Sequence, residues 1–396
     1  MGQMKLLIVG GTGVLSSAVV AEAIAQKIEV TIITRGIKKK EIPGGVTYIK
    51  ADYRNREMML AKLEGKRYDA VIDFICYNRK QIDYSIELLH RFADQYVFIS
   101  TACVYDSRVQ GVKDENADKV LPDWNYSVQK WECECFLKGQ AEKLGFNYTV
   151  VRPCVTYDDT RIPYGVMPLY GYHWTFCARI LSGKPVLRWD GGNARWNMMR
   201  VEDFAVGLLG VIGNPHCYGE AYNISGDNSY SWNEVLHTLG ELLGKDPTVF
   251  DVSSEEFKKY YPDRKGEIAG RSLDLIVSNN KVKGIVPSFG TTYSLKAGLQ
   301  RTLEAYEGDD YQLGIDWKYD AAMDRVIKVL SKKRGLSTKQ FNLGFNDYLG
   351  TATSADRRVY WLEFHRDNPM IKTSLLGARF FGKIVRSFKN GRGHHK

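Results

Sequence analysis

Three polar residues in the middle of the chain have types and a spacing that could support proton transfer. Tyr126 and Lys130 lie four residues apart in "YSVQK", so they share one face of a helix. Thr101 precedes Tyr126 by 25 residues and follows the apolar run "QYVFIS". A free phenol has a pKa of about 10, and a nearby ammonium group lowers it toward neutral pH. We therefore expect Tyr126 to exchange a proton, Lys130 to supply charge, and Thr101 to hold the reacting oxygen.

The N-terminal sequence predicts a turn that binds a diphosphate. In "MKLLIVGGTGVLSSAVV" an apolar run is followed by glycines and then by a helical pattern. A strand, a glycine-rich turn and a helix N-terminus direct backbone N–H groups and the positive end of a helix dipole toward an anion. The residues that we expect near the phosphates are Gly10, Thr12, Gly13, Val14 and Leu15.

Further apolar segments repeat this alternation of strand and helix. "EVTIITRG", "VTYIKAD", "YDAVIDFICY", "QYVFIST" and "FNYTVVRP" predict five more strands, with helical patterns around 81–92 and 131–144. The alternation predicts an α/β fold with a Rossmann-type, doubly wound parallel sheet. We predict a dinucleotide-binding domain over 1–160, a smaller substrate-binding lobe over 161–309 that is partly interleaved with it, and a basic helical extension over 310–396.

Together these motifs resemble those of the extended short-chain dehydrogenase/reductases, the NAD(P)-dependent epimerase/dehydratase family. "GGTGVLS" is similar to the family's GxxGxxG, with Ser16 in place of the third glycine. "STACVYD" resembles its serine/threonine segment, and "YSVQK" its YxxxK, which is followed by "VRP". The resemblance covers about residues 4–300. It implies an NAD(P)-dependent enzyme in which Thr101, Tyr126 and Lys130 are catalytic, and in which the lysine also holds the nicotinamide ribose.

The resemblance also implies further cofactor contacts. The end of the second strand meets the adenine ribose, and an acidic residue there favours NAD. Here that segment carries Arg35, near Lys38–Lys40. Because an arginine can pair with a 2′-phosphate, we expect NADP, with NAD as the alternative. Asp52 corresponds to the residue that meets the adenine amine. The other expected cofactor contacts are Tyr53, Phe74, Ile75, Ser100, Lys130 and Pro153.

Neighbouring residues bear on the reaction and the substrate. Family members that perform dehydration usually carry an acid just after the catalytic threonine, but Ala102 and Cys103 occupy those positions here. We therefore expect an epimerase or ketoreductase acting on a carbinol or keto carbon of a nucleotide-linked or other activated sugar. The family's phosphate-binding arginine corresponds to Trp196, and Arg195 is adjacent to it. Arg195 and Arg264, which resembles the second family arginine, are the expected substrate contacts.

Several segments also resemble a non-catalytic branch of the same fold, the chloroplast stem-loop RNA-binding proteins. The shared segments are "VTIITRG", "DFICYNRKQID" and "FNYTVVRP". A scaffold for RNA has no need of Thr101, Tyr126 and Lys130 together, so we favour an enzyme over RNA binding. A catalytically inactive NADP sensor stays open as a third alternative.

Composition adds constraints on partners and compartment. The seven cysteines have no paired spacing, which predicts reduced thiols in a cytoplasmic protein and no metal site. We recognise no signal peptide and no apolar run near the ~18 residues of a spanning helix.

Residues 310–396 carry 17 Lys+Arg and 8 Asp+Glu. The whole formal charge of +9 therefore lies in this C-terminal part of the chain. Residues 374–396 form a basic amphipathic pattern, from which we expect peripheral contact with an anionic membrane. Docking of this tail on the protein itself, and homodimerisation, stay open.

Overall fold

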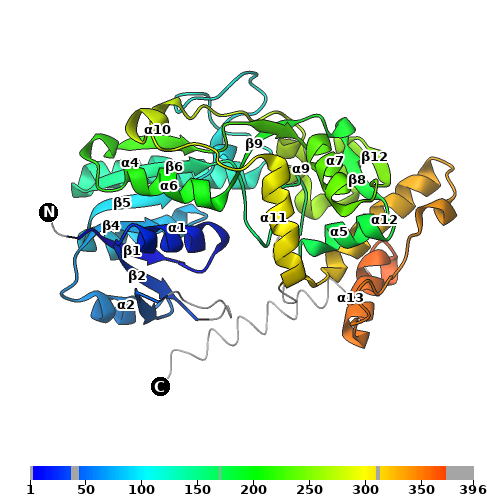
Figure 1. The fold of residues 1–396 in the computed structure, drawn as a ribbon, viewed down its shortest axis with the longest axis horizontal. Helices are drawn as coiled ribbons and strands as arrows, with labels where there is room; N and C mark the ends of the chain where they lie inside the picture. Colours follow the sequence, from blue (N-terminus) through cyan, green and yellow to red (C-terminus); the bar gives the residue numbers. More distant parts are fainter. Residues whose placement is uncertain (1–2, 37–43, 169–170, 309–312, 372–396) are drawn as a thin grey trace.

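A parallel sheet of seven strands forms the N-terminal half of the computed structural model, which describes residues 3–36, 44–168, 171–308 and 313–371 (Figure 1). The strand order is β10-β6-β5-β4-β1-β2-β3. The strands are β1 (Lys5–Val9), β2 (Glu29–Thr34), β3 (Val46–Lys50), β4 (Tyr68–Asp73), β5 (Ala93–Ile99), β6 (Asn147–Pro153) and β10 (Glu220–Ile224). The first six of these strands lie where the sequence predicted the strands of this sheet. β10 comes from the region assigned to the second lobe, so the two parts of the chain are interleaved.

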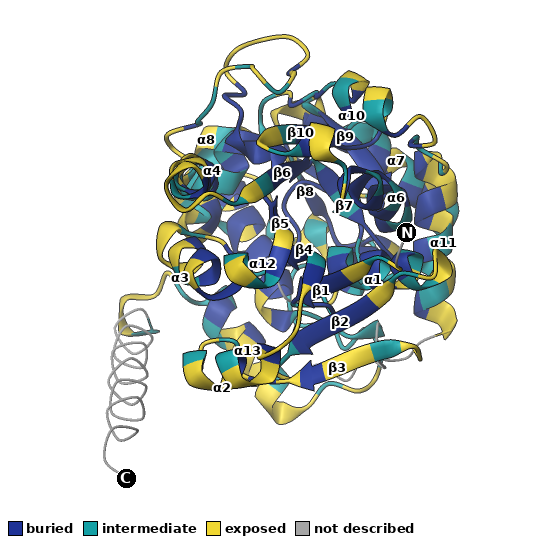
Figure 2. Cartoon of the chain, turned by 90° about the vertical axis from the view of Figure 1, so that its left-hand side faces the viewer, coloured by how far each residue is buried: buried dark blue, intermediate teal, exposed yellow. Residues whose placement is uncertain are grey.

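Helices cover both faces of this sheet because its strands bury side chains on both sides. Leu6 and Ile8 of β1 pack into one apolar cluster, whereas Leu7 and Val9 pack into another on the opposite face. Figure 2 shows β1 and β2 largely buried, whereas the edge strand β3 and the outer sides of the helices are largely exposed. The sheet is therefore doubly wound, as predicted. The first cluster includes residues of α1 (Val14–Ala25) and α6 (Val201–Val211), and the second includes residues of α2 (Arg56–Leu63), α3 (Arg79–Leu89) and α4 (Asn125–Leu144).

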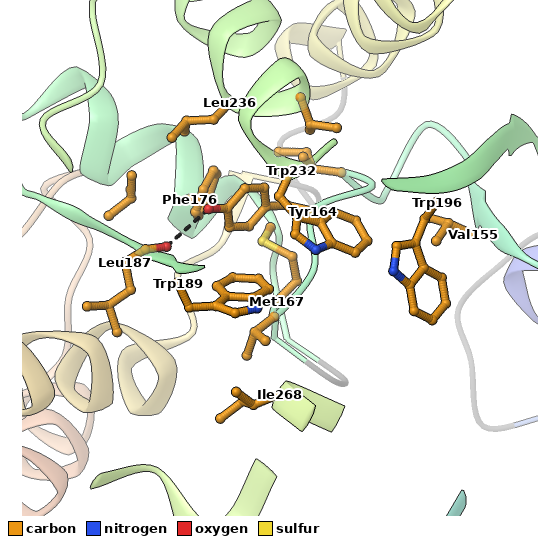
Figure 3. Close-up of a cluster of buried hydrophobic side chains, with 14 of the residues drawn as sticks. Val155, Tyr164, Met167, Phe176, Leu187, Trp189, Trp196, Trp232, Leu236 and Ile268 are labelled. Carbon is orange, nitrogen blue, oxygen red and sulfur yellow. Dashed lines mark hydrogen bonds between the residues drawn. The ribbon is translucent and has the colours of Figure 1, made fainter. Parts of the chain in front are cut away.

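The second lobe surrounds an aromatic core of its own (Figure 3). The Tyr164 ring packs edge-on against Trp189 and Trp232, and its hydroxyl donates a hydrogen bond to the Leu187 carbonyl at 3.1 Å. The strands of this lobe are β7 (Val155–Tyr157), β9 (Arg195–Arg200) and β11 (Ser229–Ser231) in one sheet, and β8 (Val186–Trp189) with β12 (Val249–Val252) in another. Its helices are α5 (Trp174–Leu181), α7 (Trp232–Leu243), α8 (Ser254–Tyr260), α9 (Lys265–Arg271) and α11 (Leu295–Gly308), whereas α10 (Asn280–Ile285) packs on β10 and α6 of the larger sheet.

The described part of the C-terminal extension is docked on this lobe. Its helices are α12 (Trp317–Lys333) and α13 (Ser354–Phe364), and α12 contributes Tyr319 and Met323 to the aromatic core. Arg334 caps α12, and Gly335 follows it at a φ of 68°, a backbone conformation that glycine adopts readily at a helix end. Residues 374–396, on which the membrane prediction rests, lie outside the described residues. Within the described ranges no helix is both long and apolar enough to cross a membrane.

Four buried charges fasten α12 to the lobe. The Asp320 carboxylate lies 2.5 Å from the Arg179 guanidinium and 3.2 Å from the Lys184 ammonium. Asp324, one helical turn later, lies 2.8 Å and 2.7 Å from the same two cations. All four side chains are 0% exposed. Two positive and two negative charges therefore neutralise one another at a position shielded from solvent. A buried ion cluster requires such neutralisation.

Candidate active site

The carboxyl ends of β1 and β4 form the crevice where the strand order reverses, the position at which such sheets bind nucleotides. Gly10 follows β1 with a φ of 91°, and a Cβ there would lie 2.6 Å from Cγ2 of Ile75, which follows β4. The position therefore requires glycine for both conformation and space. The Thr12 N–H closes the turn on the Gly10 carbonyl at 2.8 Å. The other predicted cofactor contacts at this edge of the sheet are Phe74, Ser100 and Pro153, each of which ends or directly follows a strand.

Ser16 accounts for the departure from the third glycine of the turn. Its hydroxyl donates to the Gly10 carbonyl at 2.7 Å and accepts from the Gly13 N–H at 2.8 Å. These two hydrogen bonds connect both ends of the turn and stabilise it. The first turn of α1 has no acidic residue. The N–H groups of Val14 and Leu15 and the positive end of the helix dipole are thus available to an anion. The turn therefore fits the diphosphate of a dinucleotide.

The residues expected at the adenine end lie after β2 and β3. Arg35 is exposed, and Asp52 is bound through both carboxylate oxygens by the Arg54 guanidinium at 3.2 and 3.1 Å. Hydrogen bonds from Arg54, and to a smaller extent the charge of Arg35, lower the pKa of Asp52. Tyr53 is half-buried beside it. Arg35 and Asp52 therefore lie near the same edge of the sheet, while Lys38–Lys40 lie outside the described residues.

Thr101 and Tyr126 meet beyond the carboxyl end of β5. Thr101 begins a short 3-10 turn, and its hydroxyl accepts a hydrogen bond from the Cys103 N–H at 3.2 Å. Tyr126 lies in the first turn of α4, with its phenol near the Thr101 side chain. Burial raises the pKa of Tyr126, while the nearby Thr101 hydroxyl and the charge of Arg271 oppose that rise. A phenol and a hydroxyl so placed can share one substrate oxygen, through which the phenol can exchange a proton.

Lys130 is held by backbone carbonyls at the edge of the sheet. Its ammonium donates to the carbonyls of Cys76 at 2.6 Å and Ile99 at 2.9 Å, which lie beyond β4 and at the end of β5. Burial lowers the pKa of Lys130. An ammonium has three N–H donors, and these two carbonyls use two. The helix does place Tyr126 and Lys130 on one face, but the sheet edge decides where the ammonium points.

A buried polar network that the sequence analysis missed supports this wall of the site. The Glu134 carboxylate accepts hydrogen bonds from the Ser100 hydroxyl at 2.5 Å and from Arg152 at 2.6 Å. Arg152 also donates to the Tyr105 hydroxyl at 2.9 Å, which donates to Asn223 at 2.7 Å. The network joins α4 to β5, β6 and β10. Two signals were present in the sequence: the glutamate one helical turn after the lysine of "YSVQK", and the arginine of "VRP".

Each of the two arginines expected at the substrate has an acidic partner, at the surface for Arg195 and largely buried for Arg264. Arg195 lies 2.7 Å from the Glu234 carboxylate, and Arg264 forms an ion pair with Glu267. A third arginine, Arg271 at the end of α9, differs, because no described residue accepts a hydrogen bond from its Nε or Nη1. The sequence analysis missed it. The sequence signal for it was "GEIAGR", in which two glycines four residues apart indicate a helix that another segment approaches closely.

The fold and the arrangement at the sheet edge define a Rossmann-type enzyme that uses a dinucleotide. The chain matches the NAD dependent epimerase/dehydratase family over residues 6–225, which is more than half of its length. The chain belongs to this family and is an enzyme of the extended short-chain dehydrogenase/reductase type.

The names of individual relatives indicate different functions. The chain is 25% identical over 281 residues to the chloroplast stem-loop binding protein of 41 kDa b of Arabidopsis thaliana, covering 66% of this chain and 70% of that one. It is 20% identical over 252 residues to 2′-dehydrokanamycin reductase of Streptomyces kanamyceticus, covering 64% and 70%. The structure of UDP-glucose 4-epimerase from Thermotoga maritima with UDP-glucose is similar, with a TM-score of 0.59 at 20% identity over 77% of this chain and 99% of that one. This structural likeness shows a shared fold.

Proposed function

We propose that the protein is an NAD(P)-dependent epimerase or ketoreductase that acts on a carbinol or keto carbon of a nucleotide-linked or other activated sugar. The observation that carries the proposal is the meeting of Thr101 and Tyr126 beside a turn that fits a dinucleotide. Tyr126 exchanges the proton of the substrate oxygen, and Thr101 steadies the charge that develops there. Lys130 binds the cofactor ribose with its remaining donor. The nicotinamide, when bound, supplies or accepts the hydride.

The residues after Thr101 support this reaction over dehydration. Ala102 has no acidic group, and burial raises the pKa of the Cys103 thiol, which therefore stays neutral. One relative is named a reductase and another an epimerase, which are the two reactions that we propose here.

A panel of nucleotide sugars and sugar ketones tests the proposal. We expect the protein with NADP⁺ or NADPH to convert at least one compound to its epimer or its alcohol, as seen by NMR of the product. Mass spectrometry of ligand retained through purification would direct the choice of panel. A retained lipid or non-sugar ketone that is turned over, with no conversion of any sugar, would contradict the substrate class.

We further propose a preference for NADP over NAD because Arg35 lies at the end of β2 and no acidic residue occupies that segment. Arg35→Ala should weaken NADPH binding about 10-fold or more and leave NADH binding unchanged, since a hydrogen bond to a charged group contributes about 1.5–3 kcal/mol. Fluorescence titration measures both affinities. Arg56→Ala is the matched control, because that arginine pairs with Glu87 on the neighbouring helices. Tighter NADH binding in the wild type, unchanged in Arg35→Ala, would reject this preference.

RNA binding is the second candidate, favoured by the 25% identity to the chloroplast stem-loop binding protein. It would gain support if the protein bound stem-loop RNA and turned over no member of the panel. Peripheral membrane contact through residues 374–396 and homodimerisation are also proposals, and both rest on the sequence alone.

A further inference from the structure

Arg271 is enclosed by tryptophans beside the catalytic residues. Its guanidinium carbon lies 4.2 Å from the ring centroid of Trp196, 5.5 Å from that of Trp232 and 6.0 Å from that of Trp124. Figure 3 shows Trp232 next to Tyr164 within the aromatic core and Trp196 at one side of it. Aromatic faces attract a cation but accept none of its N–H groups as a carboxylate would. Nε and Nη1 are buried, and within the described ranges neither has a hydrogen-bond partner. Such unsatisfied donors are unfavourable in a folded protein.

The helix that carries Arg271 packs against Trp124, the residue that directly precedes the catalytic helix. A Cβ at Gly270 would lie 2.3 Å from the Trp124 ring, and a Cβ at Gly266 would lie 3.0 Å from the same ring. These two glycines, one turn apart, let α9 approach the residues just before Tyr126. Burial dominates the pKa of Tyr126, but the charge of Arg271 also acts on it. The guanidinium is therefore fixed close to the phenol.

The charges around Arg271 do not neutralise it. Among the described residues it forms no ion pair, and Glu267 on the same helix is bound to Arg264. Burial raises the pKa of the Cys103 thiol, which stays neutral, as does the phenol. The charge of Lys130 does not change this balance, because the buried carboxylates Asp73 and Glu134 act on it. A partly buried guanidinium without an acidic partner favours an anionic ligand.

We propose that Arg271 binds a carboxylate that the substrate carries next to its reacting carbinol, so that the substrate is an acidic sugar. This inference rests on the proposed function, because Tyr126 defines where the reacting carbon lies. Arg271 as a whole is partly exposed although its Nε and Nη1 are buried, so a ligand must approach the guanidinium through the exposed part of the side chain. A nucleotide phosphate offers the same anionic oxygens. We favour the carboxylate because Arg271 lies near the phenol, where the sugar ring must be held.

Calorimetric titration of the full-length protein with UDP-glucuronate, UDP-glucose and UDP, each at saturating NADP⁺ or NAD⁺, tests the proposal. We expect the wild type to bind UDP-glucuronate at least 10-fold tighter than UDP-glucose. Arg271→Met should weaken UDP-glucuronate binding about 10- to 100-fold and change the other two affinities less than about twofold. Arg271→Lys should fall between. Arg188→Met, which removes an exposed partner of Asp251, is the control and should change none of them.

Two outcomes would overturn the assignment. A wild type without preference for UDP-glucuronate would show that no carboxylate is bound here, even if Arg271→Met failed to fold. An equal loss of UDP affinity in Arg271→Met, with cofactor binding intact, would assign the arginine to the phosphate. The proposed function fails separately: selective binding of UDP-glucuronate without turnover of any sugar would support the role of Arg271 and contradict the reaction. Turnover of a neutral sugar that is unchanged in Arg271→Met would support the proposed reaction and contradict the proposed role of Arg271.

Discussion

Replacing Tyr126 with phenylalanine should lower turnover by about 10²- to 10⁴-fold, the range that a positioned acid–base group contributes. The change removes only the phenol oxygen. The Trp124 and Tyr126 rings, 5.8 Å apart between centroids, should therefore stay packed. Because the phosphate turn and Lys130 are untouched, NADPH affinity should stay within about twofold of the wild type. Steady-state rates with the substrate found in the panel, and fluorescence titration of the cofactor, provide the two measurements.

Two further variants make this result specific. Thr101→Ala should also reduce turnover, by a smaller factor, because it removes a hydrogen bond to the reacting oxygen and leaves the acid–base group in place. Tyr260→Phe removes a phenol oxygen from α8, away from the sheet edge, and should leave the rate unchanged. A Tyr126→Phe enzyme that kept more than a tenth of wild-type turnover would have its proton donor elsewhere.

Replacing Asp320 with leucine should lower the free energy of unfolding by about 3–5 kcal/mol, the cost of breaking a buried ion pair. Arg179 and Lys184 would then share the single carboxylate of Asp324 in a region without water. The Tyr348 hydroxyl, which donates to Asp320 at 2.9 Å, would also lose its acceptor. Urea unfolding followed by tryptophan fluorescence measures the change. Limited proteolysis should show that the docked helices α12 and α13 become accessible first.

The double variant Arg179→Met with Asp320→Leu separates charge imbalance from lost packing. It leaves Lys184 paired with Asp324, so it should be more stable than Asp320→Leu alone. Asp251→Leu is the control: its exposed pair with Arg188 should contribute less than about 1 kcal/mol. Equal stability losses for Asp320→Leu and Asp251→Leu would show that the buried cluster is not what fastens the extension.

The sequence predicted the α/β sheet well because its signals are local. Apolar strands, the glycines of "GGTGVLS" and the helical spacing of Tyr126 and Lys130 each depend on residues within about one element. The parallel topology follows from the alternation of strand and helix, since parallel neighbours need a crossover connection. Gly10 is an example: the turn requires its positive φ whatever the rest of the chain does. The family, the doubly wound fold and the meeting of Thr101 with Tyr126 could therefore be expected before the structure was known.

Only the tertiary structure decided which charges are free to act. Arg195, Arg264 and Arg271 are equivalent as sequence letters, yet the first two have acidic partners and the third is surrounded by tryptophans from three separate segments. Lys130 likewise points to carbonyls 54 and 31 residues away. The energy of a buried charge depends on the dielectric and on the nearest opposite charge, and both are set by contacts between segments distant in sequence. Local patterns therefore place these side chains on their elements, and only the packing of the elements determines their partners.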